Sequence, residues 1–211
     1  MKTRLLLLLL PLLALCACSE ESENDNNNEY ANWQVRNEQF FAQKMAEARA
    51  ARDAARALYG DAWQEHSEWL ILRDYQLSPD AAASYLDSIP VQVLQRGTGS
   101  GSPLYTDTAS VCYLGRLMPT DVHPQGYPFS FTGTLPTDAQ VFGETTRAPV
   151  KSLVSGNVAG FTTALQHMHI GDRWRIYLPP GQAYGSNATT LIPAYSVLDF
   201  TLELRAYFKP Q

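Results

Sequence analysis

The sequence has little cysteine and no general surplus of positive charge. Three cysteines occur in 211 residues, and 16 Lys and Arg stand against 21 Asp and Glu, which gives a formal net charge of −5. A protein that neutralises nucleic-acid phosphates needs a basic surplus. Only residues 1–18 have one, through Lys2 and Arg4. We therefore expect no nucleic-acid partner.

The sequence also lacks the short motifs of several enzyme classes. It contains no G-x-S-x-G, no P-loop and no G-x-G-x-x-G fingerprint. His167 and His169 are two residues apart, a spacing that directs their rings away from each other at a helix end, and no Cys or Glu completes a ligand set. We expect neither a metal nor a cofactor.

The apolar run at the start of the chain is too short to cross a membrane. Residues 5–15 form it, whereas a membrane-spanning helix needs about 20 residues. Lys2 and Arg4 precede the run. A charged start, a short apolar stretch and a small residue before a break are typical of a secretory signal.

The end of this segment, Leu15-Cys16-Ala17-Cys18, resembles the lipobox of bacterial lipoproteins. Cys18 fits the lipidated position because the small residue Ala17 comes just before it. We predict a lipoprotein signal peptide over residues 1–17 and lipidation of Cys18, with a plain signal peptide as the alternative. One thiol, Cys112, would then remain, and it cannot form an internal disulfide.

Residues 18–29 are predicted to be a disordered acidic tether. Residues 19–29 contain five acidic side chains and no apolar one, so the segment has nothing to bury. An acidic stretch after the lipid-bearing cysteine also resembles the signal that sends some gram-negative lipoproteins to the outer face of the outer membrane. We expect a cell-envelope protein that is lipid-anchored to the outer membrane, facing either the periplasm or the surface.

Residues 30–77 are predicted to form a helical arm. Apolar residues recur at helical spacing through Phe41, Met45, Ala48 and Ala55, in a segment rich in Ala, Arg and Glu. Gly60-Asp61 is expected to break this helix, and a second helix would run through residues 69–72. The stripe is narrow, so it needs a partner. That partner is the following domain, the arm's own second helix, or a second copy in a homodimer through residues 32–75.

Residues 78–89 are predicted to be a linker, and from residue 90 the apolar pattern changes to period two. The alternation covers residues 91–95, 111–113, 173–178 and 198–205 and indicates strands with one covered face. Residues 161–168, ended by Gly171, form the helix-like segment that would cover it. For residues 90–211 we predict an α+β fold in which a bent antiparallel β-sheet wraps around a short helix.

Five motifs follow one another in this part of the chain. They are V-C-Y-L-G at 111–115, G-F-T-T-A-L at 160–165 ahead of I-Y-L-P-P, A-Y-G at 183–185, I-P at 192–193 and L-D-F-T-L-E-L at 198–204. They occur in the same order and at nearly the same spacing as in the FKBP family of peptidyl-prolyl isomerases, which the chain resembles across residues 90–208. The resemblance implies the same fold and an activity on X–Pro bonds.

The resemblance also implies a shallow aromatic pocket between the sheet and the helix. Phe161 would form its floor, at a position where the family usually has Trp. Its walls and rim would be Tyr113, Val158, Ile192, Phe200 and Tyr184. One hydrogen bond to substrate is assigned to the Tyr184 hydroxyl and another to the backbone N–H of Ile192. Each of these residues taken alone is more often plain core. Their joint arrival at motif positions favours a pocket role for Tyr113, Phe161, Tyr184 and Ile192.

The chain departs from the family pattern where the family has G-x-x-F-D. Two phenylalanines are candidates for this position, Phe129 followed by Ser130 and Phe142 followed by Gly143. In both cases the Asp is missing, and residues 117–141 resemble an insertion at the pocket mouth. Two functions therefore stay open. One is an isomerase that assists the folding of proline-containing exported polypeptides, and the other is a non-catalytic, membrane-anchored chaperone or adaptor module.

Overall fold

The computed structural model describes residues 28–78, 80–81, 84–134, 142–143 and 146–210. The expected signal peptide, the lipidation residue Cys18 and nearly all of the expected tether lie outside these residues, so the structure does not test those predictions. Among the described helices, none combines the length and apolar character that a bilayer-spanning segment requires.

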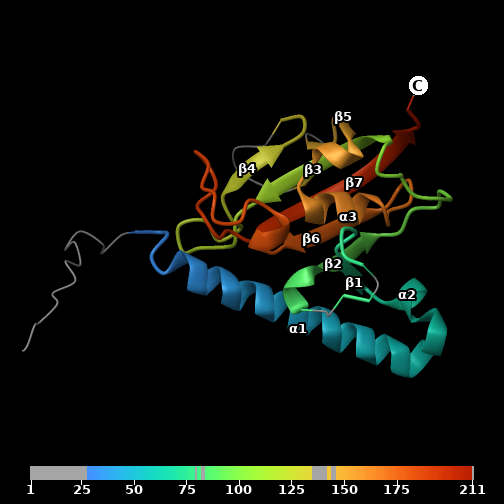
Figure 1. The fold of residues 1–211 in the computed structure, drawn as a ribbon, viewed down its shortest axis with the longest axis horizontal. Coiled ribbons are helices and arrows are strands. Elements are labelled where there is room, and N and C mark those ends of the chain that lie inside the picture. The colour runs from blue at the N-terminus through green and yellow to red at the C-terminus, as the bar shows by residue number, and fades with distance from the viewer. Residues whose placement is uncertain (1–27, 79, 82–83, 135–141, 144–145, 211) are drawn as a thin grey trace, which may run out of the picture.

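A long helix leads into an antiparallel sheet (Figure 1). The described helices are α1 (Trp33–Tyr59), α2 (Trp63–His66) and α3 (Ala159–Leu165). The described strands are β1 (Trp69–Arg73), β2 (Ser88–Gln95), β3 (Thr108–Arg116), β4 (Pro128–Phe131), β5 (Val150–Leu153), β6 (Arg173–Leu178) and β7 (Leu198–Phe208). This is the α+β architecture that the sequence predicts.

The strand order is β1-β2-β6-β7-β3-β4, and β5 pairs with β3 beyond the end of β4. All pairs are antiparallel. β7 is central because it pairs with β6 on one side and with β3 along residues 108–116 on the other. Strands β3, β4 and β5 thus lie together at one end of the sheet, where the candidate site is found.

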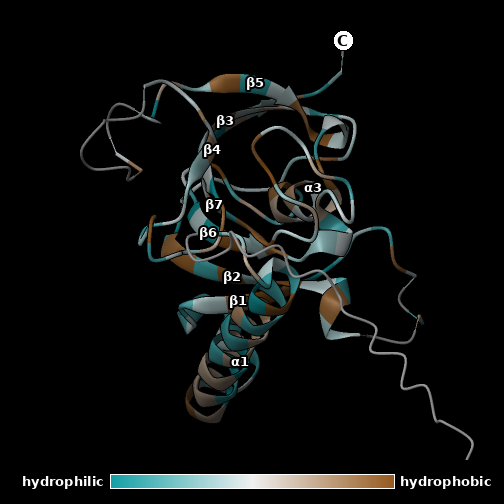
Figure 2. Cartoon of the chain, turned by 90° about the vertical axis from the view of Figure 1, so that its left-hand side faces the viewer, coloured by the Kyte–Doolittle hydropathy of each residue, from teal (hydrophilic) through white to brown (hydrophobic). Residues whose placement is uncertain are grey.

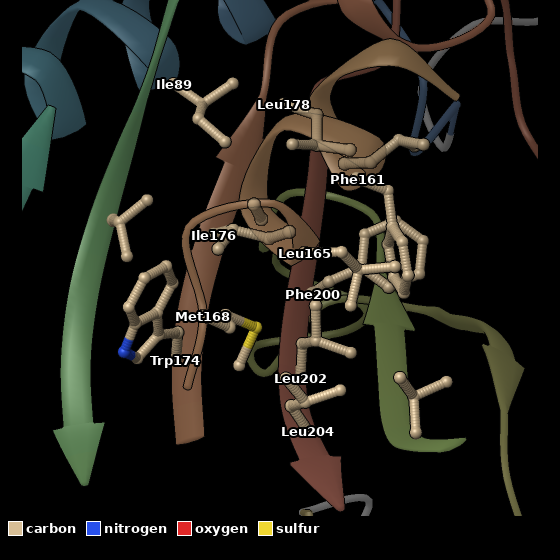
Figure 3. Packing of buried hydrophobic residues seen from close by; sticks show 14 of the residues in the cluster. Ile89, Phe161, Leu165, Met168, Trp174, Ile176, Leu178, Phe200, Leu202 and Leu204 are labelled. Carbon is tan, nitrogen blue, oxygen red and sulfur yellow. The ribbon is translucent and has the colours of Figure 1, made fainter. Parts of the chain in front are cut away.

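The two helical elements cover opposite faces of the sheet. Along β6, Trp174, Ile176 and Leu178 pack in the cluster that contains α3, while Tyr177 packs in the cluster that contains α1. Figure 3 shows the first group, with the side chains of β6 and β7 gathered beside Leu165 and Met168. Each large apolar side chain buried in this way contributes about 1.5–3 kcal/mol to the stability of the fold. The alternation along β6 thus stabilises the packing on both faces of the sheet.

Helix α1 packs on its own sheet. Phe41, Met45 and Ala48 are at most 2% exposed and contact the cluster of Trp69 and Tyr177. Two polar contacts fix the start of α1 to the segment before β7. Nε1 of Trp33 donates to Oγ of Ser196 over 2.8 Å, and Oδ1 of Asn37 accepts the N–H of Val197 over 2.8 Å.

The stripe that motivated a homodimer through residues 32–75 is therefore covered within one chain. The remaining apolar residues of α1 that face solvent are scattered, with Val35 54% and Leu58 77% exposed. A dimer would have to use surfaces other than the stripe, and its existence stays a prediction.

The predicted second helix through residues 69–72 is wrong, because these residues form strand β1. Trp69 pairs with Gln92 and Leu72 with Ile89. An unbroken apolar run of four residues has no period of its own, and here alternate members pack on the two faces of the sheet. The sheet thus begins inside the predicted arm. The expected break at Gly60 is present: α1 ends where Gly60 takes φ of 56°.

The helix that covers the sheet is shorter than expected. α3 ends at Leu165, with Gln166 as its cap, so Gly171 does not cap it. Gly171 instead takes φ of 95° where the turn before β6 passes close to Gly97. Its N–H donates to the carbonyl oxygen of Leu204 over 2.8 Å. The positive φ explains why residue 171 is a glycine, but the glycine lies in a turn between α3 and β6 and is not a helix cap.

Candidate active site

A cavity of about 890 Å³ opens between α3, the strands β3 to β5 and the loop that precedes β7. Most of the site residues expected from the sequence line it: Tyr113, Phe129, Val158, Phe161, Tyr184, Ile192 and Phe200. They come from strands β3, β4 and β7, from the start of α3 and from the loop after β6. The fold thus gathers residues that lie up to 87 positions apart in the sequence, from Tyr113 to Phe200.

An edge-to-face cluster of aromatic rings forms the wall of the cavity. The Phe200 ring centroid lies 5.2 Å from that of Phe161, 5.4 Å from that of Phe129 and 6.0 Å from that of Tyr113. The planes of these pairs are inclined by 71–86°. This arrangement places the positive edge of one ring against the negative face of the next and is worth about 0.5–1.5 kcal/mol per pair beyond burial. The wall is therefore apolar and held in one shape.

Burial distinguishes the floor from the rim. Phe161, Phe200 and Ile192 are between 4% and 7% exposed, whereas Tyr184 is 41% exposed. A hydrophobic stretch also reaches the outside of the molecule at β5 (Figure 2), where Val150 is 41% exposed and lines the cavity. The cavity thus has a buried aromatic interior and an accessible, partly apolar mouth.

Gly115 makes the ring cluster possible. A Cβ atom at this position would lie 2.4 Å from Cε1 of Phe200 and 2.9 Å from Cζ of Phe129. Any side chain there would have to displace the rings. The glycine of the V-C-Y-L-G motif is therefore explained by the close approach of two aromatic rings to β3.

Phe129, rather than Phe142, lies in the cavity. Strand β4 pairs with β3 so that Ser130 is opposite Gly115, and this register brings Phe129 beside the other rings. Phe142 lies elsewhere, with the Arg173 guanidinium 5.4 Å from its ring centroid. The sequence left both candidates open. The expected insertion over residues 117–141 begins directly after β3 and contains strand β4 of the sheet; residues 135–141 lie outside the described part.

Ser130 occupies the position at which the family pattern has Asp. Its Oγ donates to the phenolic oxygen of Tyr113 over 3.4 Å, a long and weak hydrogen bond. Lys151 is the one charged side chain among the described residues that line the cavity. The site therefore offers apolar surface and hydroxyl groups and holds no carboxylate in its described lining.

The expected donor at Ile192 is not free. Its backbone N–H donates to Oγ1 of Thr189 over 3.0 Å, so it would have to leave this hydroxyl to reach a substrate; the role assigned to Ile192 stays a prediction. The Tyr184 hydroxyl makes no hydrogen bond within the described part of the chain. The same holds for the backbone N–H of Val158, which lines the cavity at the start of α3. These two groups are available to a ligand.

The remaining candidates from the sequence lie away from this cavity. No group of three or more possible metal ligands occurs among the described residues. Nδ1 of His167 contacts the carbonyl oxygen of Thr163 at 2.8 Å, and His167 and His169 line a separate cavity of about 330 Å³ beside α2. Cys112 is fully buried, and this burial raises the pKa of its thiol, as expected for a structural residue.

A comparison with known protein families matches residues 127–205 to the family described as FKBP-type peptidyl-prolyl cis-trans isomerase. The chain contains an FKBP-type domain. The matched range includes Phe129, Phe161, Tyr184 and Phe200, whereas Tyr113 precedes it. The α+β fold of the chain is accordingly that of an FKBP-type domain with an N-terminal helix.

Curated relatives support the same family. The chain is 31% identical over 136 residues to "Macrophage infectivity potentiator" of Trypanosoma cruzi, and this match covers 64% of this chain and 60% of that protein. It is 34% identical over 119 residues to "FKBP-type peptidyl-prolyl cis-trans isomerase FkpA" of Aeromonas hydrophila, which covers 56% of this chain and 38% of that protein. The chain thus spans less than two thirds of the length of either relative.

Among solved structures, a peptidyl-prolyl cis-trans isomerase from Pseudomonas syringae pv. tomato is similar to the chain. The similarity covers 77% of this chain and 96% of that chain, with 26% sequence identity and a TM-score of 0.45.

Proposed function

We propose that this chain is a peptidyl-prolyl cis-trans isomerase. The observation that carries the proposal is the edge-to-face cluster of Phe129, Phe161 and Phe200 in a cavity whose rim bears the unpaired Tyr184 hydroxyl. Such a site suits a reaction that needs no nucleophile, metal or redox group. Rotation about the X–Pro bond is slow because amide resonance opposes it, and uncatalysed turnover takes tens to hundreds of seconds.

The residues of the cavity would act by binding the twisted amide better than the planar one. The prolyl ring packs against the Phe161 and Phe200 rings, while the preceding carbonyl rotates. A planar amide has more charge separation than a twisted amide, so dry surroundings disfavour the planar form. The Tyr184 hydroxyl and the Val158 N–H are placed to orient the peptide. Hydrogen bonds that form best in the twisted geometry lower the barrier.

For the substrate we propose proline-containing exported polypeptides, met at the cell envelope. The support is in the sequence, where a short apolar run with a basic start leads to a lipobox-like Leu15-Cys16-Ala17-Cys18. Lipidation of Cys18 would hold the domain at the outer membrane through residues 19–29. Fractionation of cells that produce Cys18→Ala tests this. The variant should be unprocessed or leave the membrane fraction, and continued membrane partition after signal cleavage would contradict lipid anchoring.

A non-catalytic binding module is the second candidate, and Ser130 favours it. Where the family pattern has a carboxylate beside Tyr113, this chain has a hydroxyl at 3.4 Å. A pocket of this kind could hold a prolyl segment without lowering the barrier to rotation. An isomerisation assay run together with peptide titration separates the two. Binding without acceleration would establish the module, and acceleration establishes the enzyme.

A further inference from the structure

The loop between Tyr184 and β7 is closed at two levels. At its base the Tyr195 N–H donates to the carbonyl oxygen of Gly185 over 2.8 Å. Near its tip the Thr189 N–H donates to the carbonyl oxygen of Ile192 over 2.8 Å. Thr189 thus sits at a fixed place at the cavity mouth, and it belongs to the cavity lining.

The oxygen of the Thr189 side chain accepts two backbone hydrogen bonds. The N–H of Ile192 lies 3.0 Å from Oγ1, and the N–H of Leu191 lies 3.3 Å from it. A threonine hydroxyl has two lone pairs and one proton. Both lone pairs are occupied, so further hydrogen bonding is left to the proton. Within the described part of the chain, no acceptor for that proton is found.

We propose that the Thr189 hydroxyl donates a hydrogen bond to a backbone carbonyl of the bound X–Pro peptide. It takes over the part that the sequence assigned to the N–H of Ile192, which the same hydroxyl occupies. This inference rests on the proposed function, since it names a substrate contact of the same cavity.

Two properties of this hydroxyl suit it to the role. The two N–H groups polarise the oxygen, and such chains of hydrogen bonds strengthen the outer donor. The loop closure between Gly185 and Tyr195 and the pairing of Thr189 with Ile192 hold the donor before the peptide arrives. A donor that is already oriented loses little freedom on binding. The neighbouring Thr190 also lines the cavity, but no backbone N–H of the described residues donates to its hydroxyl.

Three variants of the full chain test whether the Thr189 hydroxyl contacts the peptide. Thr189→Val keeps the shape of the side chain and removes the hydroxyl, Thr189→Ser keeps the hydroxyl, and Thr190→Val is the matched control. For an X–Pro tetrapeptide we expect Thr189→Val to lower kcat/KM about three- to tenfold, the effect of one neutral hydrogen bond. Thr189→Ser should stay within about twofold of the wild type, and Thr190→Val should lose less activity than Thr189→Val. The binding affinities measured by titration with the same peptide should follow the same order as the kcat/KM values.

Changing the peptide distinguishes a direct contact with the Thr189 hydroxyl from an effect of Thr189 on the shape of the loop alone. In a series of peptides, one backbone carbonyl oxygen at a time is replaced by sulfur, which is a weaker acceptor. At one position the replacement should weaken binding to wild type and Thr189→Ser and leave Thr189→Val unaffected. If every replacement acts equally on wild type and Thr189→Val, the proposal is overturned. It is also overturned if Thr189→Val matches wild type, or if Thr189→Ser is as impaired as Thr189→Val.

These outcomes are distinct from failure of the proposed function. A wild-type chain that binds the peptide without accelerating isomerisation would refute the enzyme, while the titrations would still support or overturn the Thr189 contact. A wild-type chain that neither binds nor accelerates any X–Pro peptide overturns both.

Discussion

The Oγ atom of Ser130 lies 3.4 Å from the phenolic oxygen of Tyr113, across the paired strands β3 and β4. The family pattern has a carboxylate at this position, and a carboxylate accepts a stronger hydrogen bond than a hydroxyl does. The relationship therefore locates the point at which this chain departs from its family.

Ser130→Asp should raise kcat/KM for an X–Pro peptide several-fold, because a charge-assisted hydrogen bond from Tyr113 is about twice as strong as a neutral one. The measurement is a protease-free isomerisation assay. Gly143→Asp is the matched control, since Phe142 packs against Arg173 outside the cavity. A gain with Gly143→Asp and none with Ser130→Asp would contradict the placement of Phe129 in the pocket.

Gly115→Ala should disturb the aromatic wall. The added Cβ would lie 2.4 Å from a Phe200 ring carbon, so the rings must move, and overpacking of this kind costs about 1–3 kcal/mol of unfolding free energy. We expect a lower midpoint in urea and weaker peptide binding. Gly181→Ala is the control, because a Cβ there meets no atom within 4 Å. Equal stability and binding in the two variants would argue against the close approach.

Glu203 holds the outer face of the sheet together. Its side chain is 3% exposed and pairs with Arg147 at 3.0 Å, with Arg173 at 3.2 Å and with Arg205. Burial alone would raise the pKa of this carboxyl, but hydrogen bonds from Arg147 and Arg205 and the charge of Arg173 bring it below its usual value. A carboxyl with a lowered pKa in the folded state stabilises it above the unfolded pKa. This contribution is lost as the pH falls through the folded pKa.

Glu203→Gln should therefore destabilise the chain by about 1–3 kcal/mol at pH 7, because the partly exposed Arg173 and Arg205 lose their charged hydrogen-bond partner. Its unfolding free energy should also fall less than that of wild type between pH 5 and pH 3. Urea unfolding at several pH values measures both. Glu65→Gln, at an exposed position of α2, should change neither. A Glu203→Gln variant with the acid sensitivity of wild type would show that this carboxyl does not carry the effect.

The sequence allowed the sheet and most of the pocket to be predicted, for identifiable reasons. Strands β6 and β7 alternate because one face packs in the main hydrophobic cluster, as Ile176 and Leu202 do, while the other face carries polar groups such as the Arg175–Asp199 ion pair. Strand β1 was missed because its residues 69–72 are all apolar, and a short run without alternation suits helix and strand equally. Its pairing with β2 is a tertiary contact that no local pattern encodes.

The details of the site depended on information beyond the motifs. The choice between Phe129 and Phe142 depended on the register of β4 against β3. The hydrogen-bond partner of the Ile192 N–H depended on where the Thr189 side chain points. A threonine three residues before such an N–H is a known local competitor for it, so the spacing from Thr189 to Ile192 was the signal available in the sequence.

The most direct test of the proposed activity is the rate of cis-to-trans conversion of X–Pro tetrapeptides with the purified full chain, its Tyr184→Phe variant and its Tyr195→Phe variant. Both tyrosines lie in the same loop and are similarly exposed, at 41% and 40%, but Tyr184 alone belongs to the cavity lining. We predict acceleration by wild type and Tyr195→Phe, and a several-fold lower kcat/KM for Tyr184→Phe, as expected for loss of one neutral hydrogen bond worth about 0.5–1.5 kcal/mol. A wild-type chain that leaves the uncatalysed rate unchanged for every X–Pro peptide would contradict the proposal.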